Sequence, residues 1–137
     1  MIKVLLADDH RFVRKSLRTL LERTGDIEVV ATASNGLEAV AQANLHSPDV
    51  VVLDVSMPVM DGIEAARQIA EQRPGSKIVM ISIYDTSPYV HSSLKAGASG
   101  YVLKDLAASD LAAAIRTVAR GKRFYSEKVA EKARGLI

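Results

Sequence analysis

Five polar side chains in this sequence stand where a short apolar run ends. They are Asp8, Asp9, Asp54, Ser82 and Lys104. If the apolar runs are strands of one parallel sheet, these side chains meet at its carboxyl edge, where ligands bind in open α/β sheets. Three carboxylates, a hydroxyl and an ammonium gathered there suit a divalent cation beside a phosphoryl group.

The chemistry that fits this set is phosphoryl transfer to a carboxylate. Asp54 can attack phosphorus and give an acyl phosphate. Its negative charge repels the incoming group, so a hard cation is needed, and Mg²⁺ held by Asp8 and Asp9 would serve. Ser82 and Lys104 are then the candidates for contacting the phosphoryl oxygens, one as a hydroxyl donor and one as a fixed positive charge.

Taken singly, an Asp after a strand is often only a helix cap. The coincidence of an acidic pair, a further acid, a hydroxyl and a lysine at successive strand ends favours a functional site. Asp61 stands beside Gly62 and is interpreted as a helix cap. His10 adjoins the acidic pair, but an all-oxygen site suits Mg²⁺, so His10 is interpreted as a solvent-facing residue.

The elements that must position these residues alternate along the chain. Strands are predicted at residues 2–7, 27–33, 50–55, 77–83 and 100–103. Helical periodicity or helix-start signals follow each of them, beginning with an amphipathic helix over residues 11–24. Five strands alternating with five helices imply right-handed crossovers and a doubly wound parallel sheet of the α/β class.

Local signals mark several helix ends. Gly25 is expected to end the first helix. Asn35 and Asp61 each stand three residues before a Glu, which is the capping-box spacing. Ser87 before Pro88 predicts an N-cap followed by a first-turn proline.

Composition excludes several classes of protein. The chain has 137 residues and no Cys, so Cys-based redox and metal chemistry are excluded and a single domain is expected. No apolar run is long enough for a signal peptide or a membrane span, which predicts a cytoplasmic protein without membrane association. The net charge is +2, with +4 in residues 107–137 and −2 in residues 1–106. Mixed signs in the basic segment favour a solvated face over a nucleic-acid surface.

Past Gly121 the chain has too few apolar residues for another domain. Ser126 is a possible cap for a further helical stretch that carries Val129, Ala130, Ala133 and Leu136. We interpret residues 122–137 as the start of a linker.

Residues 2–121 resemble the receiver domains of two-component response regulators. The motifs that carry the resemblance are Ala7-Asp8-Asp9-His10, Asp54 with the stretch 57–62, Ser82, and the stretch 97–104. The resemblance implies a flavodoxin-like sheet of order 2-1-3-4-5 in a single receiver domain, residues 1–121.

The resemblance also assigns roles. Asp54 would be phosphorylated by a sensor histidine kinase, and the chain would be a phospho-acceptor that assists its own phosphorylation and dephosphorylation rather than an enzyme. Ser82 and Lys104 would hold the phosphoryl group, and Tyr101 would be the switch aromatic that turns inward on phosphorylation. Residues Ser56 and Tyr84 lie where the family tunes the phosphate lifetime. The implied Mg²⁺ ligands are Asp8, Asp9, Asp54 and the backbone carbonyl of Ser56.

Two details narrow the subfamily. Many receivers have a proline after the site lysine, often through a cis bond, whereas Asp105 follows Lys104 here, so no cis peptide is expected. This Lys-Asp pair and the Asp-Asp-His start are similar to NarL/LuxR-type regulators. Those continue through a linker into a helix-turn-helix domain, so we expect a transcription regulator that contacts DNA only through a C-terminal domain missing from this chain.

Other functions on this fold fit less well. A haloacid-dehalogenase-type hydrolase requires a second Asp two residues after the nucleophile, where Ser56 stands. Flavin or dinucleotide binding requires a phosphate-cradling loop, and no G-x-G-x-x-G is present. A stand-alone or phosphorelay receiver without a DNA-binding output stays open as the alternative.

The predicted partner surface lies on the first and fifth helices. Leu111, Ile115 and Val118 form the apolar stripe of the fifth helix, and away from it lie Ala112, Ala113, Arg116 and Ala119. Small residues allow close approach of another helix, and Leu21 is expected to flank the basic face of the first helix. We expect a homodimer strengthened by phosphorylation, although alanines are also simply good helix formers on a solvated face.

Overall fold

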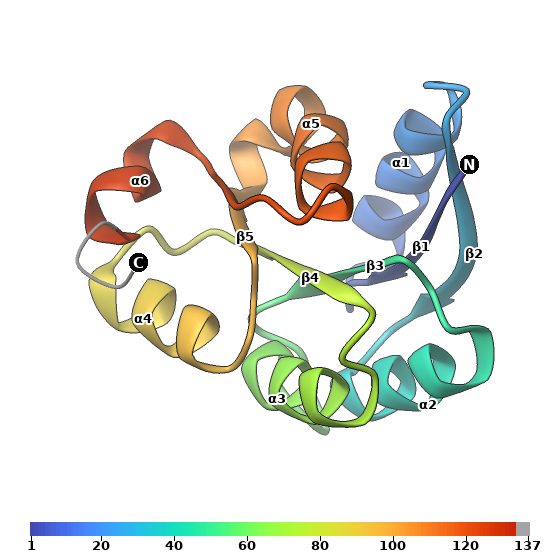
Figure 1. Cartoon of the computed structure of the whole chain (residues 1–137), viewed down its shortest axis with the longest axis horizontal. Helices are drawn as coiled ribbons and strands as arrows, with labels where there is room; N and C mark the ends of the chain where they lie inside the picture. Colours follow the sequence, from blue (N-terminus) through green and yellow to red (C-terminus); the bar gives the residue numbers. More distant parts are fainter. Residues whose placement is uncertain (134–137) are drawn as a thin grey trace.

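The computed structural model describes residues 1–133 and contains one parallel sheet in the order β2-β1-β3-β4-β5-β6 (Figure 1). The strands are β1 (Ile2–Ala7), β2 (Ile27–Ala33), β3 (Val50–Asp54), β4 (Lys77–Ser82), β5 (Gly100–Leu103) and β6 (Phe124–Tyr125). The predicted α/β class and the order 2-1-3-4-5 are confirmed. The prediction of five strands is one short, because the two residues of β6 are too few to show a strand period.

Helices cover both faces of the sheet. They are α1 (Arg11–Glu22), α2 (Gly36–His46), α3 (Gly62–Gln72), α4 (Ser87–Lys95), α5 (Ala107–Ala119) and α6 (Glu127–Ala133), with a short 3-10 turn η1 (Lys104–Leu106). Figure 1 shows α1 and α5 above the sheet and α2, α3 and α4 below it, with α6 beside α4. Because these strands are parallel, the carboxyl ends of β1, β3, β4 and β5 lie at the same edge of the sheet.

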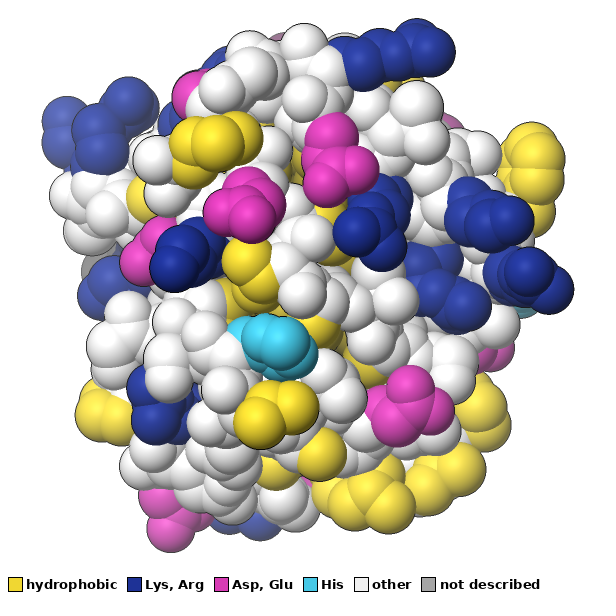
Figure 2. Space-filling model, turned by 90° about the vertical axis from the view of Figure 1, so that its right-hand side faces the viewer, with side chains coloured by type: hydrophobic (Ala, Val, Ile, Leu, Met, Phe, Trp, Pro, Cys, Tyr) yellow, Lys and Arg dark blue, Asp and Glu magenta, His cyan; other side chains and the backbone are white. Residues whose placement is uncertain are grey.

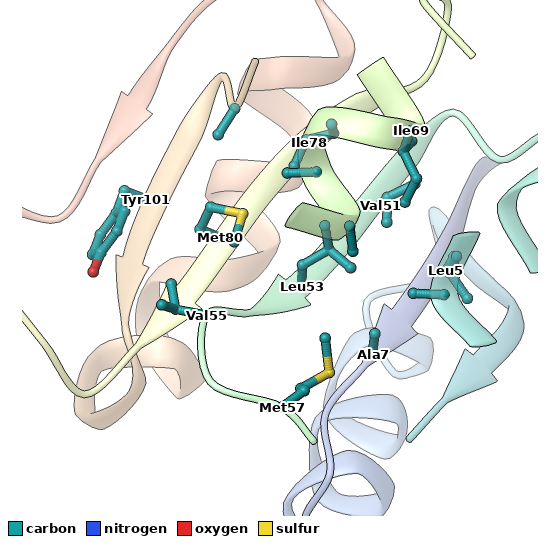
Figure 3. Packing of buried hydrophobic residues seen from close by; sticks show 14 of the residues in the cluster. Leu5, Ala7, Val51, Leu53, Val55, Met57, Ile69, Ile78, Met80 and Tyr101 are labelled. Atoms are coloured by element: carbon teal, nitrogen blue, oxygen red, sulfur yellow. The ribbon is translucent and has the colours of Figure 1, made fainter. Parts of the chain in front are cut away.

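Alternate residues of each strand fill two cores. Leu5, Leu53 and Met80 pack toward α2, α3 and α4 (Figure 3), whereas Leu6 and Val52 pack toward α1 and α5. Because both faces are covered, the strands are apolar almost throughout, as strands of a doubly covered parallel sheet are. Every residue of β3 is buried, so the strand is held firmly and the position of Asp54 at its end is fixed.

Most local predictions are confirmed. The Asn35 and Asp61 side chains accept hydrogen bonds from the amides of Glu38 and Glu64, both at 2.8 Å. The first helix ends at Glu22, slightly earlier than predicted. The described residues contain no cis peptide bond, in agreement with the expectation at Lys104-Asp105.

Four predictions are wrong in detail. The third strand, predicted to reach residue 55, ends at Asp54. Thr86, not Ser87, is the N-cap of α4, and Ser87 lies inside the helix. The strand β4 ends at Ser82, and the Ile83 that follows is exposed. Leu21 is fully buried in the core rather than flanking a basic surface, because it lies four residues after Leu17 on the face that meets the sheet.

Residues 124–133 pack against the domain. The predicted helix after Ser126 forms as α6, and its Val129 and Ala133 are fully buried in the same cluster as Tyr101. Leu136, also assigned to this stretch, lies outside the described residues. The prediction that this segment leads into a linker stays a prediction.

Figure 2 shows the face that lies at the right of Figure 1. Lys and Arg side chains are interspersed there with Asp and Glu side chains and with small hydrophobic groups. Such a mixture is ordinary for a solvated surface. Within the described part of the chain, no helix is long and apolar enough to cross a membrane.

Candidate functional site

Three predicted site residues meet at the carboxyl edge of the sheet. Asp54 ends β3, Asp8 follows β1, and Lys104 follows β5. The Lys104 Nζ atom lies 2.8 Å from Asp54 Oδ2 and 3.0 Å from Asp8 Oδ2, so one ammonium bridges two carboxylates. Both carboxylates are almost inaccessible, with Asp8 0% and Asp54 4% exposed.

Neighbouring groups orient the two carboxylates. Asp8 Oδ1 accepts a hydrogen bond from the His10 amide at 2.8 Å, and the Asp8 carbonyl accepts one from the Arg14 guanidinium at 2.7 Å. Asp54 Oδ1 accepts from the Ser56 amide at 3.2 Å. The role of Arg14 was not predicted, because its position on an amphipathic helix looks like that of any surface arginine.

The site has more negative than positive charge, and the pKa values reflect this. Burial raises the pKa of Asp54, and Asp8 adds to the rise, while the hydrogen bond from Lys104 opposes it. Burial lowers the pKa of Lys104, but its hydrogen bonds to Asp54 and Asp8 outweigh burial, so the net shift is upward. The lysine is therefore a fixed positive charge at neutral pH.

The acidic residues could also hold a metal ion. One ligand atom from each of Asp8, Asp9, His10 and Asp54 lies within 4.8 Å of the others. Asp9 Oδ1 is buried and has no hydrogen-bond partner among the described residues. A buried carboxylate oxygen without a partner is costly unless a cation neutralises it, and oxygen ligands are those that Mg²⁺ prefers. These residues fit the ion that the sequence predicts.

His10 is largely exposed, as predicted. Its side chain is 66% accessible, and Nδ1 lies 3.3 Å from Asp9 Oδ1. The imidazole therefore covers the acidic pair from the solvent side without being buried with it.

Ser82 lies on the neighbouring strand, at the same edge. Its buried hydroxyl oxygen accepts a hydrogen bond from the Tyr84 amide at 2.9 Å. Among the described residues, no hydrogen bond joins Ser82 to Asp54 or Lys104. The residue is thus placed at the predicted edge, and the phosphoryl contact assigned to it stays a prediction.

Tyr101 is fully buried and belongs to the same apolar cluster as Leu53 and Met80. Its hydroxyl donates to the Tyr84 carbonyl at 2.6 Å, and burial raises the pKa of that hydroxyl. Tyr84 also stacks on Tyr89 with ring centroids 4.2 Å apart. The ring of Tyr101 is thus buried without any phosphoryl group, and the inward turn expected of it on phosphorylation stays a prediction.

The loop after β3 depends on a close backbone approach. The Gly62 amide donates to the Val55 carbonyl at 2.9 Å, and a Cβ at Gly62 would lie 1.9 Å from the Asp54 carbonyl oxygen. Only glycine fits there. Val59, in the same loop, has φ 71°, which is unusual for a β-branched residue and marks local strain. The sequence gives no signal for this strain.

The fold and this site define a class of protein. The chain belongs to the response regulator receiver domain family, whose model matches residues 4–116. This match covers most of the chain and confirms the resemblance inferred from the motifs.

The chain is similar to transcriptional regulatory proteins and response regulators, and to a solved two-component response regulator of the LuxR family. The transcriptional regulatory protein DegU of Brevibacillus brevis is 37% identical over 128 residues, which is 93% of this chain and 54% of that protein. The response regulator UvrY of Escherichia coli is 39% identical over 132 residues, covering 96% and 61% of the two chains. A LuxR-family response regulator from Aurantimonas superposes with a TM-score of 0.93 at 33% identity, covering 99% and 97%. This chain spans between half and two thirds of the length of the curated relatives.

Proposed function

We propose that the chain is a phosphorylation-dependent signalling switch that accepts a phosphoryl group on Asp54 from a sensor histidine kinase. The observation that carries the proposal is the Lys104 ammonium between the Asp8 and Asp54 carboxylates. The chain would act as a phospho-acceptor rather than as an enzyme with turnover on a separate substrate.

The arrangement of these residues supports transfer of a phosphoryl group from a phosphohistidine to Asp54. An Asp54 carboxylate oxygen forms a bond to phosphorus while the phosphorus–nitrogen bond of a phosphohistidine breaks, and the imidazole nitrogen keeps the electron pair. Lys104 can move its ion pair from Asp54 to a phosphoryl oxygen without leaving Asp8. Ser82, on the next strand, can donate its hydroxyl to another oxygen.

The metal that fits the acidic cluster would be Mg²⁺, held by Asp8, Asp9, Asp54 and the backbone carbonyl of Ser56. When bound, the ion neutralises the carboxylates and the incoming phosphoryl oxygens, which otherwise repel each other. This neutralisation explains why an acidic pocket is suited to bind an anionic group.

The proposed output is transcription control. DegU and UvrY are longer regulators, and the structurally similar RcsB response regulator of Salmonella typhimurium shows conformational dynamism for DNA interaction. By analogy, the chain would act in the cytoplasm, pair with a second copy on phosphorylation and contact DNA only through a further C-terminal domain. A stand-alone or phosphorelay receiver is the alternative, since nothing in residues 1–133 requires an output domain.

Labelling tests the acceptor directly. Incubation with acetyl phosphate and Mg²⁺ should add one phosphoryl group, which mass spectrometry locates on Asp54. The adduct should be absent in Asp54→Asn and after treatment with EDTA. Asp61→Asn is the matched control, because it changes a nearby carboxylate in a position where Asn also caps a helix, and it should label like the wild type. Full labelling of Asp54→Asn would overturn the proposal.

A further inference from the structure

A buried hydroxyl outside the phosphorylation site, that of Ser126, links this site to residues 124–133. Ser126 is 0% exposed and lies between β6 and α6. Its Oγ accepts a hydrogen bond from the Leu103 amide at 3.1 Å and donates one to Asp110 Oδ2 at 3.2 Å. Amide, hydroxyl and carboxylate therefore form one continuous chain of hydrogen bonds, in which the charged acceptor strengthens the whole.

The hydroxyl takes the place of a missing ladder bond. The Ser126 amide donates to the Tyr101 carbonyl at 3.0 Å, which extends the pairing of β5 with β6. In an evenly spaced parallel ladder the next bond would run from the Leu103 amide to the Ser126 carbonyl. That carbonyl instead accepts from the amides of Val129 and Ala130, at 2.8 and 3.1 Å, where α6 begins. The Ser126 side chain thus gives the Leu103 amide a partner that the backbone cannot supply.

The bond is made next to the site lysine. Leu103 is the last residue of β5, it pairs with Ser82 at the end of β4, and Lys104 follows it directly. The backbone that carries Lys104 is therefore held on one side by β4 and on the other by Ser126. Because β5 has only four residues, it makes few hydrogen bonds to its neighbours. Losing the bond to Ser126 would therefore leave the backbone at Leu103 much less restrained.

The segment that carries Ser126 is itself anchored. Val129 and Ala133 of α6 are fully buried against the cluster that contains Tyr101. Figure 1 shows α6 beside α4, next to the edge of the sheet that β5 and β6 form. A displacement of this segment would therefore move Ser126 away from Leu103.

We propose that Ser126 is a positioning residue that fixes the backbone at Leu103, so that the Lys104 ammonium stays between Asp8 and Asp54, and that it couples residues 124–133 to the phosphorylation site. This inference rests on the proposed function of Asp54. The inference predicts that the position of residues 124–133 and the reactivity of Asp54 depend on each other.

The first test compares two buried serines. Ser126→Ala leaves the Leu103 amide unpaired. Ser76→Ala is the matched control, because Ser76 is also buried and its hydroxyl donates to the Pro48 carbonyl at 2.6 Å, but at the opposite edge of the sheet. With acetyl phosphate and Mg²⁺, Ser126→Ala should label Asp54 about fivefold more slowly than the wild type, the effect of one hydrogen bond, and Ser76→Ala should stay within about twofold.

The second measurement needs no phosphorylation. In the NMR-detected amide exchange of the 137-residue chain, the Leu103 amide should exchange at least about tenfold faster in Ser126→Ala, while the Val52 amide in the sheet centre keeps its protection. Ser126→Thr retains the hydroxyl and should restore both the labelling rate and the protection. If Ser126→Ala fails to fold, Asp110→Ala replaces it, because Asp110 is half-buried and its removal weakens the same chain of bonds.

Two results would overturn the inference: Ser126→Ala labelling at the rate of Ser76→Ala, or unchanged exchange of the Leu103 amide. A wild-type chain that takes no label on Asp54 would instead overturn the proposed function. The exchange measurement separates these two failures, because it reports the Ser126 hydrogen bond without any phosphoryl group.

Discussion

Two ion pairs of nearly equal length lie at opposite edges of the sheet. At the carboxyl edge, Lys104 Nζ is 2.8 Å from Asp54 Oδ2, and the two side chains are 16% and 6% exposed. At the other edge, the Arg116 guanidinium of α5 binds both oxygens of Asp26, at 2.7 and 3.0 Å, with side chains 38% and 47% exposed. The pKa of Asp54 is raised, mainly by burial, whereas the hydrogen bond from Arg116 holds the pKa of Asp26 well below its usual range.

The contrast shows that distance alone does not decide what an ion pair does. Arg116 has one carboxylate to neutralise and does so with a planar, two-point contact in water. Lys104 shares its single charge between Asp8 and Asp54, and Asp9 lies beside them with an oxygen that has no hydrogen-bond partner within residues 1–133. The first pair links two elements, and the second leaves negative charge for a cation to neutralise. The carboxyl edge therefore keeps buried negative charge at a cost in stability.

The largest effect is expected from removing the cation at each edge. Lys104→Met should lower the free energy of unfolding by about 3 kcal/mol, because it leaves buried carboxylates uncompensated. Arg116→Met should have a clearly smaller effect, because water solvates the Asp26 carboxylate that remains. Urea unfolding in EDTA measures both variants. Equal losses would show that burial does not distinguish the two pairs.

Removing one acidic partner should change stability in opposite directions at the two edges. Asp54→Asn should raise the free energy of unfolding by about 1 kcal/mol in EDTA, because it removes repulsion with Asp8 while Lys104 keeps a partner. Asp26→Asn should lower the free energy of unfolding, because it weakens the ion pair with Arg116 and relieves no repulsion from a neighbouring carboxylate. The same urea titrations give both values, and destabilisation by Asp54→Asn would contradict the picture of a site with excess negative charge.

The two edges should also respond oppositely to acid. The pKa of Asp54 is raised, so the folded state binds the Asp54 proton more tightly than the unfolded state does. The free energy of unfolding therefore rises as the pH falls through the pKa of Asp54 in the folded state. The gain is complete below the pKa of an unfolded Asp, about 3.9. The lowered pKa of Asp26 stabilises above about 3.9, and this contribution is lost as pH falls further. Urea unfolding in EDTA should therefore show the advantage of Asp54→Asn shrinking between pH 7 and about 4. The deficit of Asp26→Asn should persist over this range, and parallel pH profiles would contradict the assignment.

The carboxyl edge was predictable because its residues follow apolar runs. Asp8, Asp54 and Lys104 could be brought together from the rule that parallel strands end at one edge, and their contacts confirm this. The helix caps followed from equally local signals, such as Asn35 and Asp61 before their glutamates, whereas the strand order was implied by the family resemblance.

The remaining contacts depend on packing at a distance in sequence. Arg116 and Asp26 are 90 positions apart, and neither residue lies in a pattern that marks it. The same is true of Ser126, whose partner Leu103 is 23 positions away, and of Gly62, whose closeness to Asp54 depends on the path of a loop. Leu21 shows the opposite error, because its place beside charged residues suggested exposure although the helix turns it into the core.

The smallest expected effect concerns self-association through α1 and α5, proposed from sequence. The burial of Leu21 removes one predicted contributor, and Ala112 is half-buried against the core instead of lying free on the surface. However, Phe12 on α1 is 82% exposed, and Ala113 and Ala119 on α5 are exposed as expected. Phosphorylation should shift the chain toward a dimer, and Ala113→Glu should weaken that shift. Ala41→Glu changes another exposed alanine, on α2 across the sheet, and as the matched control it should not weaken the shift.

Sedimentation velocity with and without acetyl phosphate measures this shift. The expected difference between the two variants is about 1 kcal/mol in dimerisation free energy, since a charge replaces a small side chain at a helix contact. The contact would pair two copies by a two-fold axis, the commonest symmetry of homodimers. A dimer that resists Ala113→Glu as well as it resists Ala41→Glu would place the interface on another surface. A phosphorylated chain that stays monomeric would mean that the alanines of α5 serve only helix formation.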